Sequence, residues 1–218
     1  EFRRVLFRSA EAQALGSSGR DMVVAYAAGY ETWADLSRRD PDQHHEKGWH
    51  PTGIFGAIGA AAACASLRRL SVEQTEHAIA LGASQSAGIM ANFGTMTKPF
   101  HAGRSAHAGV ASARLASLGF TASLDAIEHP QGFLRAVSPA GRVNLDLPMD
   151  AGRVWKLTKN RLSVKKYPLC FGTHRALDGM LDLLQQNPLR PDQIARVTVS
   201  TRSEEHTSEL QSRGLISY

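Results

Sequence analysis

The side chains with the clearest potential for chemistry lie in three short segments. In the first, Gly48-Trp49-His50-Pro51-Thr52-Gly53, His50 stands directly before a predicted helix. An imidazole there can transfer a proton near neutral pH or bind a carboxylate. The alternative is a histidine that only caps the helix, and the spacing by itself favours this alternative.

The second segment, residues 95–109, gathers Lys98, His101 and Arg104 in a stretch rich in glycine and alanine. We expect a loop from Gly94 to Gly103 that leads into a helix, where exposed backbone N–H groups and three basic side chains together bind a carboxylate. A basic loop exposed to solvent explains the same residues equally well. Nucleotide-binding loops are excluded, since no Gly-Lys-Ser/Thr ending and no preceding strand are present.

The third segment begins with the pair Lys165 and Lys166 before a rigid Tyr-Pro turn. His174 follows in the first turn of the next predicted helix. These side chains could face a cleft, although the segment by itself is a weak signal. The nine histidines do not predict a metal site, because no His-Glu-x-x-His motif occurs and His107 does not share a helical face with His101.

The composition limits the classes of partner that the protein is expected to bind. The 218 residues carry a formal net charge of +5, which suits a small anionic substrate. Basic residues do not cluster with aromatic platforms, so we expect no nucleic acid partner. The longest apolar run, residues 54–67, is shorter than the roughly 18 residues that a membrane span needs, so we expect no membrane association. Two distant cysteines and no recognisable leader indicate a cytoplasmic protein.

The two ends have an unusual relationship. The DNA string GAGTTCAGACGTGTGCTCTTCCGATCT encodes residues 1–9, and its reverse complement encodes residues 202–210. Unrelated termini of a natural protein have no reason to be complementary strands of one oligonucleotide. We therefore interpret residues 1–9 and 202–218 as translated sequencing adapter, and residues 10–201 as an internal fragment of a longer protein.

The remaining pattern predicts a mainly α fold. Helical periodicity or small-residue composition is found in four stretches: Ser18–Arg39, a buried helix from Thr52, Ser71–Gly82 with a capping box at Gln74, and Arg104–Leu118 closed by Gly119. Later residues predict a helix capped by Thr173 and a strand over Ile194–Ser200. We expect an all-α domain over 10–150 and the start of an α+β domain over 151–201.

Four segments in this order, GWHPTGIFGAIGAAAA, TKPFHAGRSAHAGVASARLASLGFTA, EHPQGF and KKYPLCFGTH, resemble the MmgE/PrpD family. The family includes 2-methylcitrate dehydratases, cis-aconitate decarboxylases and epimerases of small di- and tricarboxylates. The resemblance implies a large helical domain with a smaller α+β lid, a homodimer, and no cofactor.

Matched to the family motifs, His50, Lys98 and Lys165 are implied as catalytic residues. His174 is a candidate for substrate binding, with His101 and Arg104. We expect a fragment of a cofactor-independent lyase of the hydro-lyase type, with cis-aconitate decarboxylation, epimerisation or carboxylate binding without turnover as alternatives. The family's Asp- and His-bearing segment upstream of His50 has no counterpart in this sequence, so we expect the chain alone to be inactive.

Overall fold

The computed structural model describes residues 10–160 and 164–200, so the two proposed adapter segments lie outside the described residues. The chain divides into two compact units, Glu1–Leu162 and Ser163–Tyr218. The sequence placed a domain boundary at residue 150, whereas packing continues in the first unit through the helix at 156–160.

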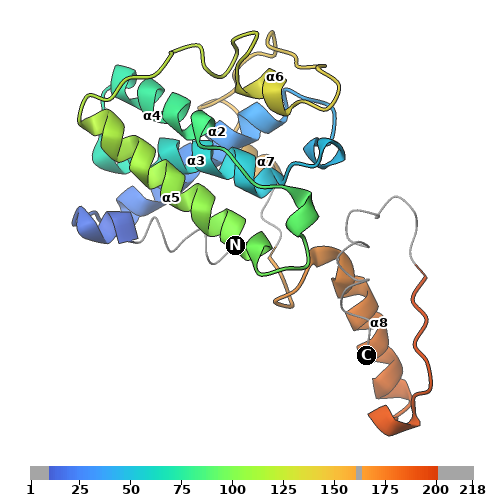
Figure 1. The fold of residues 1–218 in the computed structure, drawn as a ribbon. Helices are drawn as coiled ribbons and strands as arrows, with labels where there is room; N and C mark the ends of the chain where they lie inside the picture. The colour runs from blue at the N-terminus through green and yellow to red at the C-terminus, as the bar shows by residue number, and fades with distance from the viewer. Residues whose placement is uncertain (1–9, 161–163, 201–218) are drawn as a thin grey trace. The chain divides into compact units, whose positions relative to one another are not determined.

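The first unit is built around one central helix (Figure 1). Residues 10–14 are helical. The helices that follow are α2 (Gly19–Ser37), α3 (Pro51–Arg68), α4 (Val72–Ser84), α5 (Thr97–Ser117), α6 (Phe133–Val137) and α7 (Lys156–Asn160), with short 3-10 helices η1 (His44–Lys47) and η2 (Met90–Asn92). Helix α3 packs against α2, α4 and α5. The described residues of this unit contain a single isolated bridge, Trp49 with Ile89, in place of a sheet.

The central position of α3 follows from its small side chains. An ideal Cβ at Gly29 of α2 would lie 2.4 Å from the carbonyl oxygen of Gly59, and one at Gly109 of α5 would lie 2.3 Å from the Cβ of Ala60. The backbones of three helices therefore approach more closely than larger residues would allow. The buried small-residue helix predicted from Thr52 onwards is confirmed.

The predicted signals at the start of α4 and at the end of α5 are present, but the predicted start of α5 is wrong. The predicted capping box of Ser71 and Gln74 is present at the start of α4, and Gly119, with φ +87°, follows α5. However, α5 begins at Thr97, so the loop predicted from Gly94 to Gly103 is wrong from Thr97 onwards. Proline is tolerated in a first helical turn, which lets the helix start before Pro99.

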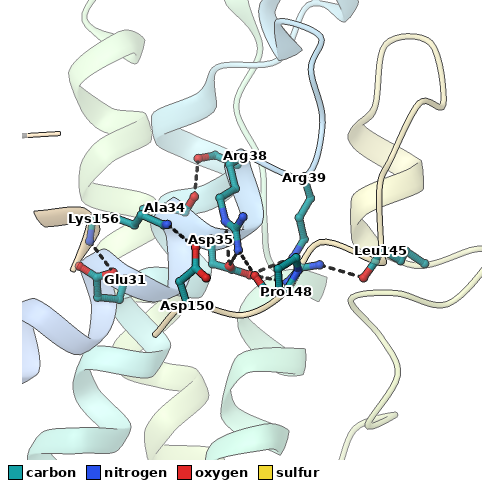
Figure 2. A network of polar contacts seen from close by, with 10 residues as sticks. Glu31, Ala34, Asp35, Arg38, Arg39, Leu145, Pro148, Asp150 and Lys156 are labelled. Atoms are coloured by element: carbon teal, nitrogen blue, oxygen red, sulfur yellow. Dashed lines mark hydrogen bonds and ion pairs between the residues drawn. The ribbon is translucent and has the colours of Figure 1, made fainter. Parts of the chain in front are cut away.

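A polar network ties the segment after α6 to α2 (Figure 2). The Glu31 carboxylate accepts hydrogen bonds of 2.9 Å from the backbone N–H groups of Lys156 and Leu157 at the start of α7. Arg39, held by Asp35, donates to the carbonyl oxygen of Leu145 at 3.0 Å. The segment between α6 and α7 is thereby fixed to α2 through charge-assisted hydrogen bonds.

The second unit contains η3 (Phe171–Thr173), α8 (His174–Gln186) and η4 (Pro191–Gln193). The predicted helix is present, but the Thr173 hydroxyl donates to the carbonyl oxygen of Cys170 at 2.7 Å and does not cap it. The strand predicted over 194–200 is wrong, since residues 164–200 form no strand. An alternating segment becomes a strand only when a partner completes its ladder.

None of the helices in the described ranges combines the length and the apolar character that crossing a bilayer requires.

Candidate functional site

His50 lies at the entrance to α3, as the sequence predicted, but its role there is not capping. It occupies the residue before Pro51, and its side chain makes no capping hydrogen bond. Its Nδ1 instead lies 3.0 Å from the Nδ1 of His101, on the second turn of α5. Both residues are only 8% exposed. The side chain of His50 therefore does not cap α3, and its catalytic role stays a prediction.

The segment between α4 and α5 holds His50 in place. The His50 N–H donates to the carbonyl oxygen of Gly88 at 3.0 Å, and the Met90 N–H donates to that of Gly48 at 2.8 Å. Gly88 has φ +123°, and a Cβ there would lie 3.1 Å from the Cγ of His101. Glycine is needed for both reasons, the backbone conformation and the space for the His101 ring.

Phe93 connects the histidine pair to a cation. Its ring meets that of His50 at 4.7 Å between centroids in an edge-to-face arrangement. The Lys98 Nζ lies 4.3 Å from the centroid of the same ring, within the range of a cation–π contact. The structure thus brings His50, His101 and Lys98 into one cluster, which we call the histidine-lysine cluster.

Two features describe the electrostatics of this cluster within the described residues. Burial lowers the pKa of His101, which favours the neutral ring. The segment 85–97 carries no ionisable side chain, and the ammonium group of Lys98 lies against the ring of Phe93. Within the described ranges, no group of three His, Cys, Asp or Glu side chains is placed to hold a metal ion.

Arg104 is placed differently from the other basic residues of α5. It is exposed, and its Nη1 lies 3.3 Å from the Nδ1 of the exposed His107, one turn further along the helix. Because α5 begins at Thr97, the predicted loop of exposed N–H groups near Arg104 is instead helix interior. The loop expected to carry Lys98, His101 and Arg104 is therefore wrong, whereas carboxylate binding by these residues stays a prediction.

Lys165 and His174 belong to the second unit. Lys165 is exposed, whereas His174 is buried between the rings of Tyr167 and Phe171, with centroids 5.1 Å away in each case. The His174 Nε2 has no hydrogen-bond partner among the described residues. The neighbouring Lys166 pairs with Asp178 at 2.5 Å.

A cavity of about 490 Å³ lies in the first unit near the start of α3. It is lined by Trp49, Ser86 and Phe133 among others, but not by His50. Trp49 and His50 are neighbours on an extended stretch of backbone, where successive side chains point to opposite sides. The cavity is therefore separate from the histidine-lysine cluster.

Sequence reasoning missed Phe93 and Gly88. Phe93 carried no signal, since one aromatic residue in a loop is common. Gly88 could have been suspected, because a glycine between a helix and a basic segment often marks a turn or a close approach. Neither residue could be connected to His50 without knowing how α3 and α5 pack.

Comparison with known proteins identifies the family of this sequence. The sequence model of the MmgE/PrpD N-terminal domain matches residues 9–146, which include the histidine-lysine cluster. The chain belongs to the MmgE/PrpD family.

Several relatives are named cis-aconitate decarboxylases. The human protein of that name is 29% identical over 188 residues, which cover 84% of this chain and 39% of the relative. The mouse protein is 29% identical over 74% of this chain and 33% of its own length. A cis-aconitate decarboxylase-like protein of Aspergillus oryzae is 31% identical over 89% and 44%. The chain thus spans about two-fifths of the length of these relatives.

Proposed function

We propose that the protein to which this chain belongs is a lyase that acts on small di- or tricarboxylates without a cofactor. The observation that carries the proposal is the histidine-lysine cluster, in which a buried imidazole and an ammonium group contact the same aromatic ring. Family membership and the names of the relatives support the class of substrate.

Both proposed reactions develop negative charge on the substrate. Loss of water from a β-hydroxy acid begins when a proton leaves a carbon next to a carboxylate. Loss of CO₂ from an unsaturated tricarboxylate leaves an electron pair on carbon, which a proton must then quench. Negative charge builds up in both cases, and a fixed cation stabilises it where it develops. In the proposal, Lys98 binds the carboxylate and His50 moves the proton.

Cis-aconitate is the first substrate to test, because three matched relatives carry its name. Dehydration of 2-methylcitrate is the second, on the strength of the family resemblance. The complete gene product would be assayed for CO₂ release from cis-aconitate and for alkene formation from 2-methylcitrate. In the proposal, Lys165 adds a second cation, and Arg104 and His174 contribute to binding. The protein is proposed to act as a homodimer.

Lys98 provides the sharpest test of this function. Lys98→Met removes the ammonium group while it keeps much of the side-chain length, so kcat/KM should fall by about 100-fold or more, the typical effect of losing one charge-stabilising group. Lys159→Met is the matched control, since Lys159 is exposed on α7. Equal activity of the two variants would contradict the role of Lys98. Stabilisation by tricarboxylates without any turnover would instead indicate a binding protein.

A further inference from the structure

The two buried imidazoles form a hydrogen-bonded pair between elements distant in sequence. His50 precedes α3 and His101 lies in α5, and their Nδ1 atoms are 3.0 Å apart. We propose that His101 is a positioning residue that sets the tautomer of His50, so that the two rings share one proton and titrate as a single group. This inference rests on the proposed function, in which His50 transfers a proton. It replaces the direct substrate contact expected of His101.

The distance between the nitrogens dictates the proton arrangement. At 3.0 Å one Nδ1 must donate and the other must accept. If His50 donates, its Nε2 carries a lone pair and is a base. If His101 donates, the Nε2 of His50 carries the proton and is an acid. The position of the shared proton therefore decides which of the two roles His50 has.

The same geometry limits the charge of the pair. One added proton gives a single imidazolium that keeps the Nδ1–Nδ1 hydrogen bond. A second would place two N–H groups head to head at 3.0 Å, so the pair holds at most one extra proton. Interacting groups of this kind titrate with apparent pKa values that belong to the pair.

Gly88 fixes both partners at once. Its carbonyl oxygen accepts the backbone N–H of His50 at 3.0 Å, while its Cα side leaves room for the ring of His101. Phe93 limits rotation of the His50 ring from another side through the edge-to-face contact. A shared proton needs such fixed geometry, because a hydrogen bond weakens steeply when the two rings turn away from each other.

Within the described residues, the ionisable side chains of the elements that hold the pair can be named. Helix α5 carries Lys98, one turn before His101, and the exposed Arg104, which contacts His107. The η2 segment has no ionisable residue, and the first one in α3 is Cys64. A carboxylate bound next to the pair would draw a proton to it, because a nearby negative charge favours the protonated imidazole.

The pairing can be measured by NMR on the 218-residue chain with ¹⁵N-labelled histidine. We expect wild-type His50 and His101 to titrate together and to show one shared Nδ1 proton. In His101→Phe, His50 should titrate as an independent group and lose this signature. His101→Asn, whose amide reaches the position of the Nδ1, should restore a fixed tautomer of His50. His107→Phe, on the exposed face of α5, is the control. Independent titration in the wild type would overturn the proposal.

Activity of the complete gene product gives a second readout. His101→Phe should lower kcat at least tenfold, leave KM within about twofold and shift the pH profile, while His101→Asn recovers most of kcat. A rise in KM with unchanged kcat would make His101 a substrate contact and overturn the positioning role. If the complete wild-type protein turns over neither acid, the proposed function fails, and the NMR result still decides the pairing.

Discussion

At the scale of single residues, Glu11 shows how a buried charge is compensated. Its side chain is 1% exposed and lies between Arg68 and Arg114, which donate to its two carboxylate oxygens at 2.7 Å each. Burial raises the pKa of Glu11, but the hydrogen bonds from the two arginines lower it by more, so the pKa lies below its ordinary value. The ionised carboxylate is therefore the stabilising form.

Glu11→Gln should lower the free energy of unfolding at neutral pH by about 2 kcal/mol, less than the ~3–5 kcal/mol for breaking a fully buried pair, because Arg114 is half exposed. A carboxyl group with a depressed pKa in the folded state stabilises fully above its unfolded-state pKa and loses this contribution as pH falls through the folded-state pKa. Urea unfolding at several pH values should show the difference from wild type shrinking in acid. Exposed Glu128→Gln should have little effect, and a pH-independent difference would contradict the argument.

The sequence pointed to individual residues of the candidate site, and their roles stay predictions. His50 and Lys98 stood out because ionisable side chains next to glycine and proline are unusual. Their spatial relation was not predictable, since the contact of His50 with His101 depends on the packing of α3 against α5. Arg104 was expected to lie with His101 because the two residues are close in sequence, but it is not part of the histidine-lysine cluster.

At the scale of elements, the closeness of α3 and α5 depends on Gly109. A Cβ there would overlap Ala60, at 2.3 Å from its Cβ and 2.6 Å from its carbonyl carbon. Gly109→Ala should cost about 1–3 kcal/mol of stability, as overpacking typically does. Gly103→Ala is the matched control on the same helix, since its Cβ would meet nothing within 4 Å. It should stabilise by about 0.5–1 kcal/mol through helix propensity. Similar urea midpoints for both variants would refute this account of the packing.

The start of α7 depends on Glu31 of α2. The Glu31 carboxylate accepts two backbone N–H groups, as an N-cap would, although it lies far away in sequence (Figure 2). In Glu31→Ala the amides of Lys156 and Leu157 should exchange with solvent about fivefold faster, as expected when an N-cap worth about 1 kcal/mol is lost. Hydrogen exchange followed by NMR measures this directly. Glu46→Ala, at an exposed residue of η1, should leave both amides unchanged.

A sequence signal predicted an element correctly only where all the residues that form the signal lie within that element. The capping box of Ser71 and the small residues of α3 are signals of this kind, and both predictions are confirmed. The start of α5 was misplaced because glycine in its second turn was taken as a loop signal. Helix α7 was missed because its anchor, Glu31, is supplied by another helix.

At the scale of the whole molecule, the chain holds one part of the candidate machinery in each unit. The histidine-lysine cluster lies in the first unit, whereas Lys165 and His174 lie in the second. The relatives are more than twice as long as the matched regions. We predict that the 218-residue chain turns over neither cis-aconitate nor 2-methylcitrate, while the complete gene product is active on one of them. Both would be assayed at equal molar concentration, and turnover by the 218-residue chain would disprove this prediction.

The composition of α3 has a consequence for how this protein can vary. Most cores fail when a large side chain is truncated, but the buried positions of α3 are occupied largely by alanine and glycine and are already near the lower limit of side-chain volume. At the alanine and glycine positions of α3, the size of an acceptable side chain therefore has an upper limit. In a library selected for folding, only Gly, Ala, Ser and Cys should be accepted at these alanine and glycine positions. The large aliphatic residues that fill ordinary cores should be rejected there.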